Sequence, residues 1–142
     1  MTAARFTLRF LLPLSLLLLF VTGCPRGPKG HPVSGRVTKG GKPLEFKPPV
    51  GMARVVFIPL DEKVKNTLGP VQAKVETDGS FKVYGKDGKG LPVGKYKVCV
   101  YHNPNGPTQD ELKGKFDETN TPFTREVKES DNTFEFDLDK PN

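Results

Sequence analysis

The chain has little of what enzymes and metal proteins use for chemistry. Among its 142 residues there are two cysteines, two histidines and no tryptophan. It contains neither an HExxH motif nor paired CxxC motifs, which are common arrangements of zinc ligands. It also lacks GxSxG, which marks the nucleophile of many hydrolases. These absences argue against an enzyme or a metal protein, and we expect no cofactor.

The sequence also lacks a convincing 3.6-residue apolar period after Pro32, so helices are not expected there. Glycine and proline instead interrupt it every eight to twelve residues, which is typical of an all-β fold. We expect an immunoglobulin-like or prealbumin-like β-sandwich of seven to eight short, mainly antiparallel strands over residues 32–142. The expected strands are Val33–Thr38, Pro43–Phe46, Ala53–Ile58, Val71–Glu76, Ser80–Tyr84, Lys95–Tyr101, Thr124–Lys128 and Thr133–Leu138.

A hairpin is expected at Asp78-Gly79. A two-residue turn there would place Val75 opposite Lys82, an apolar residue opposite a charge. A three-residue loop, Thr77–Gly79, instead places Val75 opposite Phe81, so the hydrophobic face selects the longer loop.

The same register pairs Ala73 with Val83 and makes Lys74 and Lys82 direct neighbours on the outer face. Like charges in that position are unfavourable, and an anionic ligand would relieve their repulsion. The alternative is that two solvated side chains splay apart. Lys74 and Lys82 are therefore candidate ligand-binding residues.

Two loops are the expected places for a binding site. Residues 103–122 are long and hold only Leu112 and Phe116 as large apolar residues, with an extended piece expected around Phe116. The other loop is the glycine-rich stretch 85–90. We take Phe116 and His102, which ends a strand, as further candidate ligand-binding residues.

The N-terminus reads as an export signal. Residues 1–23 contain no acidic residue, and Arg5 and Arg9 precede the apolar run Phe10–Val21. As a helix this run would reach roughly 18 Å, whereas a bilayer core is about 30 Å thick. Cleavage is therefore expected rather than a permanent transmembrane helix.

The stretch Val21-Thr22-Gly23-Cys24 resembles the lipobox of bacterial lipoproteins. The resemblance implies that the leader is cut before Cys24, whose sulfur carries a diacylglyceryl group, and that the new amino group is also acylated, for example with palmitate. An ordinary signal peptide followed by a chance cysteine is the alternative. Residues 24–31 would be the lipidated cysteine and a Pro/Gly tether. Pro25 and Arg26 stand where an inner-membrane retention signal would usually place Asp, which favours the outer membrane.

If Cys24 is acylated, Cys99 has no partner for an intrachain disulfide. The strand alternation places Cys99 opposite the face of Val98 and Val100. We expect it to be packed in a second layer or under a loop, and a reactive thiol is the alternative.

The mature chain would carry a net charge of about +4, since Arg5 and Arg9 leave with the leader. Its lysines are dispersed rather than interleaved with aromatic residues, and export separates it from nucleic acid, so we expect no nucleic-acid partner. The charge is compatible with weak attraction to anionic lipid or polysaccharide.

Taken in order, several segments resemble small bacterial lipoproteins that carry a carboxypeptidase-regulatory-like domain, related in fold to transthyretin. The resemblance implies a β-sandwich over residues 32–138. It implies no activity, because the chain is too short to include a zinc peptidase and does not end in the Tyr-Arg-Gly-Ser motif of transthyretin-like hydrolases. The segments are Val33–Thr38, Gly41–Leu44, Val55–Pro59, Thr77–Phe81, Leu91–Val98, Lys115–Asp117, Thr121–Phe123 and Asn132–Leu138.

These observations predict a non-catalytic module of the cell envelope, anchored to the membrane by lipid and binding another envelope protein or an anionic glycan. Two alternatives stay open. One is a small hydrolase or transport-associated domain, which would need several polar side chains, including His102, to converge in a pocket. The other is a plain spacer.

Overall fold

The computed structural model describes residues 28–141. The predicted leader, the acylation site Cys24 and the first part of the predicted tether lie outside the described residues. Within residues 28–141, no helix has the length and apolar character needed to cross a membrane.

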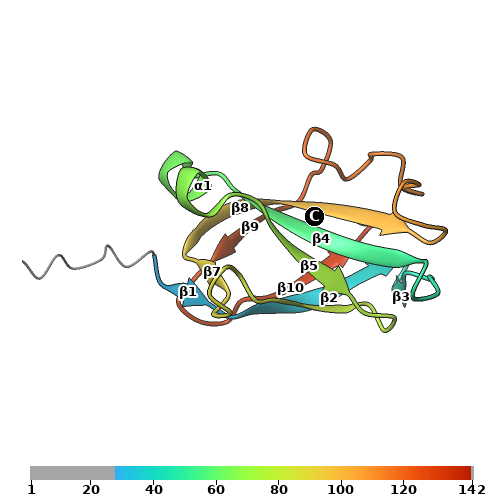
Figure 1. Ribbon diagram of the computed structural model, residues 1–142, viewed down its shortest axis with the longest axis horizontal. Coiled ribbons are helices and arrows are strands. Elements are labelled where there is room, and N and C mark those ends of the chain that lie inside the picture. The colour runs from blue at the N-terminus through green and yellow to red at the C-terminus, as the bar shows by residue number, and fades with distance from the viewer. Residues whose placement is uncertain (1–27, 142) are drawn as a thin grey trace, which may run out of the picture.

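One eight-stranded sheet forms most of the protein (Figure 1). Its strands run in the order β10-β2-β6-β5-β4-β8-β9, with β3 also paired to β2, and β10–β2 is a parallel pair. A separate two-stranded sheet joins β1 to β7. The prediction of a mainly antiparallel, all-β fold is confirmed. The strands are β1 (Gly30–His31), β2 (Val33–Lys39), β3 (Lys42–Pro43), β4 (Met52–Pro59), β5 (Val71–Val75), β6 (Ser80–Val83), β7 (Leu91–Pro92), β8 (Gly94–Asn103), β9 (Thr124–Val127) and β10 (Thr133–Asp137).

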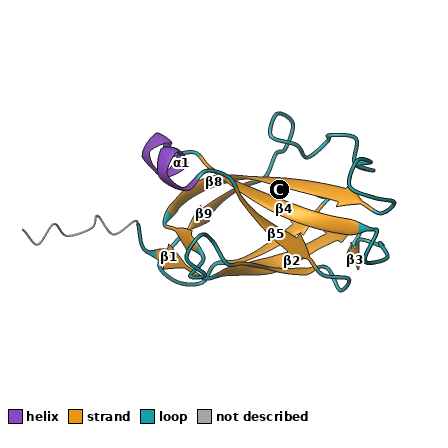
Figure 2. Cartoon of the chain, viewed as in Figure 1, coloured by secondary structure: helices purple, strands orange, loops and turns teal. Residues whose placement is uncertain are grey.

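The sheet curls, so that its two halves face each other across a core rich in phenylalanine (Figure 2). Phe57 of β4 lies 6.1 Å, between ring centroids, from Phe81 of β6. Phe123, just before β9, lies 5.0 Å from Phe136 of β10. β4 is central, as its apolar sequence predicted, because it pairs with both β5 and β8.

Tyr96 of β8 links the β7–β8 connection to the core. Its side chain is buried, and its hydroxyl donates a hydrogen bond of 2.9 Å to the carbonyl of Pro92. Burial raises the pKa of Tyr96 to about 12. The bond joins the start of β8 to β7 in the manner of a tyrosine corner.

A short helix, α1 (Glu62–Leu68), lies against the end of β4 and is absent from the strand-only prediction. Asp61 caps it by accepting a 3.0 Å hydrogen bond from the amide of Val64, and the amide of Gly69 donates to Lys65 at its end. None of its residues is fully buried, and its half-buried apolar residues, Val64 and Leu68, are too few to reveal a helical period.

The predicted strand Pro43–Phe46 was too long. Of the predicted segment, Pro43 pairs with β2 as part of β3 (Lys42–Pro43), and residues 44–51 form a loop. Leu44 and Phe46 are nevertheless buried, because the loop turns their side chains toward the core. Two prolines, Pro48 and Pro49, lack the N–H that a continued strand would donate.

The β5–β6 hairpin has the predicted three-residue loop. Val75 pairs with Phe81, and Gly79 has a left-handed φ of 84°. The predicted Ala73–Val83 and Lys74–Lys82 pairs were wrong, since Val75–Phe81 is the one pair that β5 and β6 share within residues 28–141. The two strands diverge because β5 pairs with β4 and β6 pairs with β2, on opposite halves of the curled sheet.

Residues 104–123 form an ordered covering over β8, and the extended piece predicted around Phe116 was wrong, because a series of turns lies there. The carbonyl of Phe116 accepts a hydrogen bond of 3.0 Å from the amide of Val100. The carboxylate of Asp110 accepts three backbone N–H groups, and that of Asp117 accepts two more. These Asp side chains replace the backbone partners that a strand or helix would provide.

Candidate binding groove at the distal end

The molecule has two different ends (Figure 1). The proximal end is formed by β1, β7, the 84–90 segment and α1, and it holds the first described residue, Pro28. The distal end is formed by β3, the 44–51 loop, the β5–β6 turn and the start of the β8–β9 loop. The two glycine- and proline-rich loops predicted to carry a site, 85–90 and 103–122, thus begin at opposite ends.

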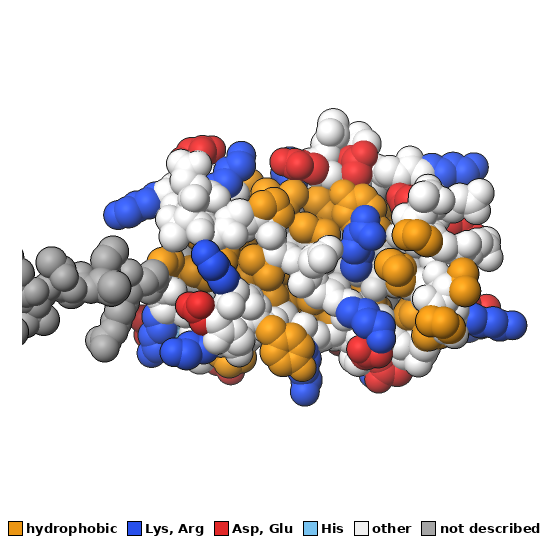
Figure 3. All heavy atoms as spheres, in the orientation of Figure 1, with side chains coloured by type: hydrophobic (Ala, Val, Ile, Leu, Met, Phe, Trp, Pro, Cys, Tyr) orange, Lys and Arg blue, Asp and Glu red, His pale blue; other side chains and the backbone are white. Residues whose placement is uncertain are grey.

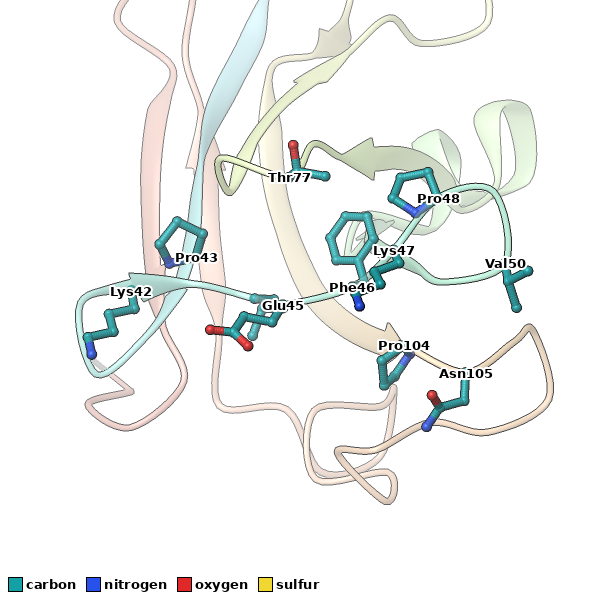
Figure 4. Close-up of a pocket in the computed structure, with 11 residues that line it drawn as sticks. Lys42, Pro43, Glu45, Phe46, Lys47, Pro48, Val50, Thr77, Pro104 and Asn105 are labelled. Atoms are coloured by element: carbon teal, nitrogen blue, oxygen red, sulfur yellow. The ribbon is translucent and has the colours of Figure 1, made fainter.

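The distal end carries a groove of about 1050 Å³, which we call the distal groove (Figure 4). The Phe46 ring points toward Thr77 and Pro48, and Pro43 lies across from them. The groove is therefore largely apolar with charged side chains at its rim. Its residues include the apolar Pro43, Phe46, Pro48, Val50 and Pro104 and the polar Lys42, Glu45, Lys47, Thr77 and Asn105.

His102, near the end of β8, supports the distal groove by contacting the 44–51 loop beneath it. Its side chain is buried, with Nε2 3.0 Å from the carbonyl oxygen of Glu45 and Nδ1 3.0 Å from the carboxylate of Glu111. Its ring also meets the Phe46 ring edge-on, at 6.4 Å between centroids. Each ring nitrogen therefore faces an acceptor oxygen. His102 thereby ties β8 to the 44–51 loop and to the 103–122 loop.

The lining of the distal groove combines proline rings with charged side chains. Its lining presents two lysines and one glutamate but no serine, cysteine or histidine. Within residues 28–141 no group of three His, Cys, Asp or Glu side chains is placed to hold a metal ion. Proline rings give a preformed apolar surface over the buried Phe46 ring, and such a surface loses little conformational entropy on binding.

Lys74 and Lys82 lie elsewhere, along a second groove between β5 and β6. Lys74 forms an ion pair of 3.2 Å with Glu76, which relieves part of the repulsion expected between the two lysines. Of the predicted ligand-binding residues, Lys74 and Lys82 thus line the β5–β6 groove, whereas His102 is buried behind the distal groove and does not line it.

Phe116 belongs to the core. It is 1% exposed and stacks on Phe123 with ring centroids 5.4 Å apart. Its ring is therefore not open to a ligand, and it anchors the 103–122 loop instead. Cys99 lies beneath the same loop, fully buried, and burial, reinforced by nearby Glu118, raises its pKa to about 11. This placement agrees with the expectation of a packed small residue.

Sequence reasoning missed the distal groove, because it assigned Pro43–Phe46 to a strand. The available signal was the cluster of three prolines around Phe46. Two prolines directly after a predicted strand indicate that the chain leaves the sheet there and forms a loop. Comparisons with protein-family models, curated proteins and solved structures gave no match.

Proposed function

We propose that the chain is a non-catalytic, lipid-anchored module of the bacterial cell envelope, built on an immunoglobulin-like or prealbumin-like β-sandwich, which binds a protein or a glycan in its distal groove. The observation that carries this proposal is the polarity of the molecule: Pro28 lies at one end, and the distal groove lies at the other (Figure 1). An anchor at Cys24, four residues before Pro28, would hold the proximal end at the bilayer and leave the groove facing away from it.

The anchor in this proposal is acylated Cys24, in the outer membrane where the cell has one. A single acyl chain binds a bilayer only marginally, at about 0.8 kcal/mol for each buried methylene, and a second chain makes the attachment stable. The five residues from Pro25 to Lys29 span roughly 15 Å when extended. The tether is short because the next residues are already part of the fold: Gly30 and His31 form β1, and the His31 ring lies 3.0 Å from the carbonyl of Glu129.

The charge of the rim favours an acidic partner. Lys42 and Lys47 are exposed at the distal groove beside a single carboxylate, Glu45. Opposite charge across an interface raises the rate of association and excludes like-charged competitors. The competing function, a small hydrolase or transport-associated domain, would need His102 to face a pocket, whereas its ring nitrogens contact Glu45 and Glu111.

The anchor is tested on the full chain expressed in bacteria, by intact mass and membrane fractionation. The expected mass is that of a chain beginning at Cys24 with added acyl groups, and Cys24→Ser should leave the membrane fraction. An uncut leader, or a first residue without a lipid adduct, would contradict the anchor.

The distal groove is tested by crosslinking the lipidated protein in native membranes. The double variant Lys42→Glu/Lys47→Glu should lose a partner that the wild type captures. The matched control is Lys95→Glu, an exposed lysine near the start of β8. Equal capture by all three proteins would remove the groove from the proposal, and capture by none would favour a spacer.

A further inference from the structure

The second groove lies where the curled sheet is incompletely closed. β5 pairs with β4 over five residue pairs and β6 pairs with β2 over four, but β5 and β6 share only Val75–Phe81. Within the described residues, the backbone of β5 from Val71 to Ala73 therefore has no strand partner on its β6 side. In Figure 1, β5 starts beside α1 and runs toward the β5–β6 turn at the distal end. The space between β5 and β6, which we call the β5–β6 groove, has a volume of about 490 Å³.

The side chains of the β5–β6 groove alternate between an apolar floor and a charged rim. Ala73 and Phe81 are buried, with Val71 half-buried beside them. The next residues along each strand, Lys74 and Lys82, point outward and are exposed. Figure 3 shows apolar side chains exposed on this side of the sheet with Lys and Arg side chains beside them. A strand laid in the groove would meet apolar groups on one face and cations on the other.

We propose that the β5–β6 groove binds an extended segment of a partner protein as an added strand, in which apolar residues alternate with Asp or Glu. The unpaired backbone of β5 would supply the ladder hydrogen bonds that give such complexes their affinity. Alternate side chains of the segment would lie over Ala73 and Phe81, and its carboxylates would lie between Lys74 and Lys82. Lys74 would exchange its exposed partner Glu76 for the segment.

A cation on the neighbouring strand adds to this preference. Arg54 of β4 stands opposite Lys74 in the register, and its guanidinium lies 4.6 Å from the centre of the Tyr101 ring. The outer face of β4 and β5 beside the groove thus carries two cations in direct register, Arg54 and Lys74. One carboxylate, that of Glu76, lies near them. An anionic glycan would also meet Lys74, Lys82 and the exposed ring of Tyr84, but a glycan would leave the β5 backbone unpaired. The incomplete ladder therefore favours a peptide.

The test uses the isotopically labelled full chain in detergent micelles and a capped synthetic peptide of seven residues in which valine alternates with glutamate and aspartate. We expect shifts in the backbone amide resonances of Val71 to Lys74 and of Lys82, with slower hydrogen exchange at those of Gln72 or Lys74. A copy of the peptide with alternate backbone nitrogens methylated cannot form the ladder and should not bind. Absence of binding at millimolar peptide, or equal binding by the methylated copy, would overturn the proposal.

Charge reversal sharpens the test. Lys74→Glu/Lys82→Glu should weaken binding of the acidic peptide on the order of tenfold or more, and a peptide with lysine in place of its acidic residues should bind this variant instead. Lys95→Glu, with one exposed lysine reversed outside the groove, is the control and should bind the acidic peptide as the wild type does. If an acidic oligosaccharide, such as a polygalacturonate fragment, shifts the same amides and the peptide does not, the site is a glycan site and the proposal fails. This outcome would not affect the proposed function of the distal groove, because Lys42 and Lys47 do not line the β5–β6 groove.

Discussion

The two ends of the molecule each hold one buried histidine but use it differently. At the proximal end His31 lies in β1, which pairs with β7, and its ring nitrogen Nδ1 lies 3.0 Å from the carbonyl oxygen of Glu129. At the distal end His102 supports loops that surround an open groove. One end of the curled sheet is therefore tied together by short strands, and the other is held open on a fixed base. Side chains of one type thus serve closure or presentation according to what surrounds them.

The largest expected effect comes from disturbing the proximal end. A side chain at Gly90 would overlap the His31 carbonyl, and Gly90 has a φ of 97°, so Gly90→Ala should lower the free energy of unfolding by roughly 3 kcal/mol. Gly88 in the same loop has a φ of 70° but open space around it, so Gly88→Ala should cost only about 1 kcal/mol. Urea unfolding measures both. Equal losses would show that backbone strain, and not contact with β1, sets the cost.

Alkaline pH should lower the stability of the fold through Cys99, which lies beneath the 103–122 loop. The folded-state pKa of about 11 lies above the ordinary thiol value of 9.0, so the folded protein holds a proton that the unfolded chain releases between those values. Stability should thus fall as pH rises from 9 to 11. Cys99→Ala should lose about 2 kcal/mol less than the wild type over that interval. Urea unfolding at several pH values checks this, and identical pH profiles would mean that Cys99 is not sealed beneath the 103–122 loop.

Removing each histidine tests the comparison directly. His102→Leu leaves the acceptors at Glu45 and Glu111 without the ring and should cost about 2 kcal/mol, whereas His31→Leu loses one contact, to Glu129, and should cost about 1 kcal/mol. Amide exchange in residues 44–51 should accelerate only in His102→Leu. If His31→Leu accelerates it equally, the two ends are coupled and the comparison does not hold.

The smallest expected effect concerns the tyrosine corner at the proximal end. Tyr96→Phe removes the hydroxyl that donates to Pro92 and keeps the ring that packs near Phe57, so it should cost about 1 kcal/mol. Thermal unfolding measures the loss. Binding at the distal groove should be unchanged, and a change there would show that β7 helps to shape the groove.

The strands were largely readable from the sequence, because burial on one face leaves an alternating pattern. β10 is an example, with Phe136 buried and the neighbouring Glu135 and Asp137 directed outward. Helix α1 was not readable, because its ends are set by Asp61 and Gly69 and none of its residues is fully buried. Pairs of two residues, such as β1 with β7, are too short to show any period.

The candidate sites were less readable than the fold, for two physical reasons. The distal groove is assembled from separate loops, and contacts such as His102 with Glu45 depend on the folded arrangement of those loops. The register beyond Val75–Phe81 failed because local alternation does not reveal that β5 and β6 pair with different halves of the sheet. Phe116 looked like a loop residue free for ligands, but apolar burial placed it against Phe123.

The most direct test of the central claim, that one end is held at the membrane and the other binds, is photocrosslinking in native membranes from two matched positions. Val50, at the distal groove, and Val93, at the proximal end, are apolar residues that are 61% and 48% exposed. Each is replaced in turn by a photoreactive phenylalanine analogue in the lipidated protein. The account predicts adducts with lipid from position 93 and with a protein or glycan from position 50. Lipid adducts from position 50, or the same protein adducts from both positions, would contradict it.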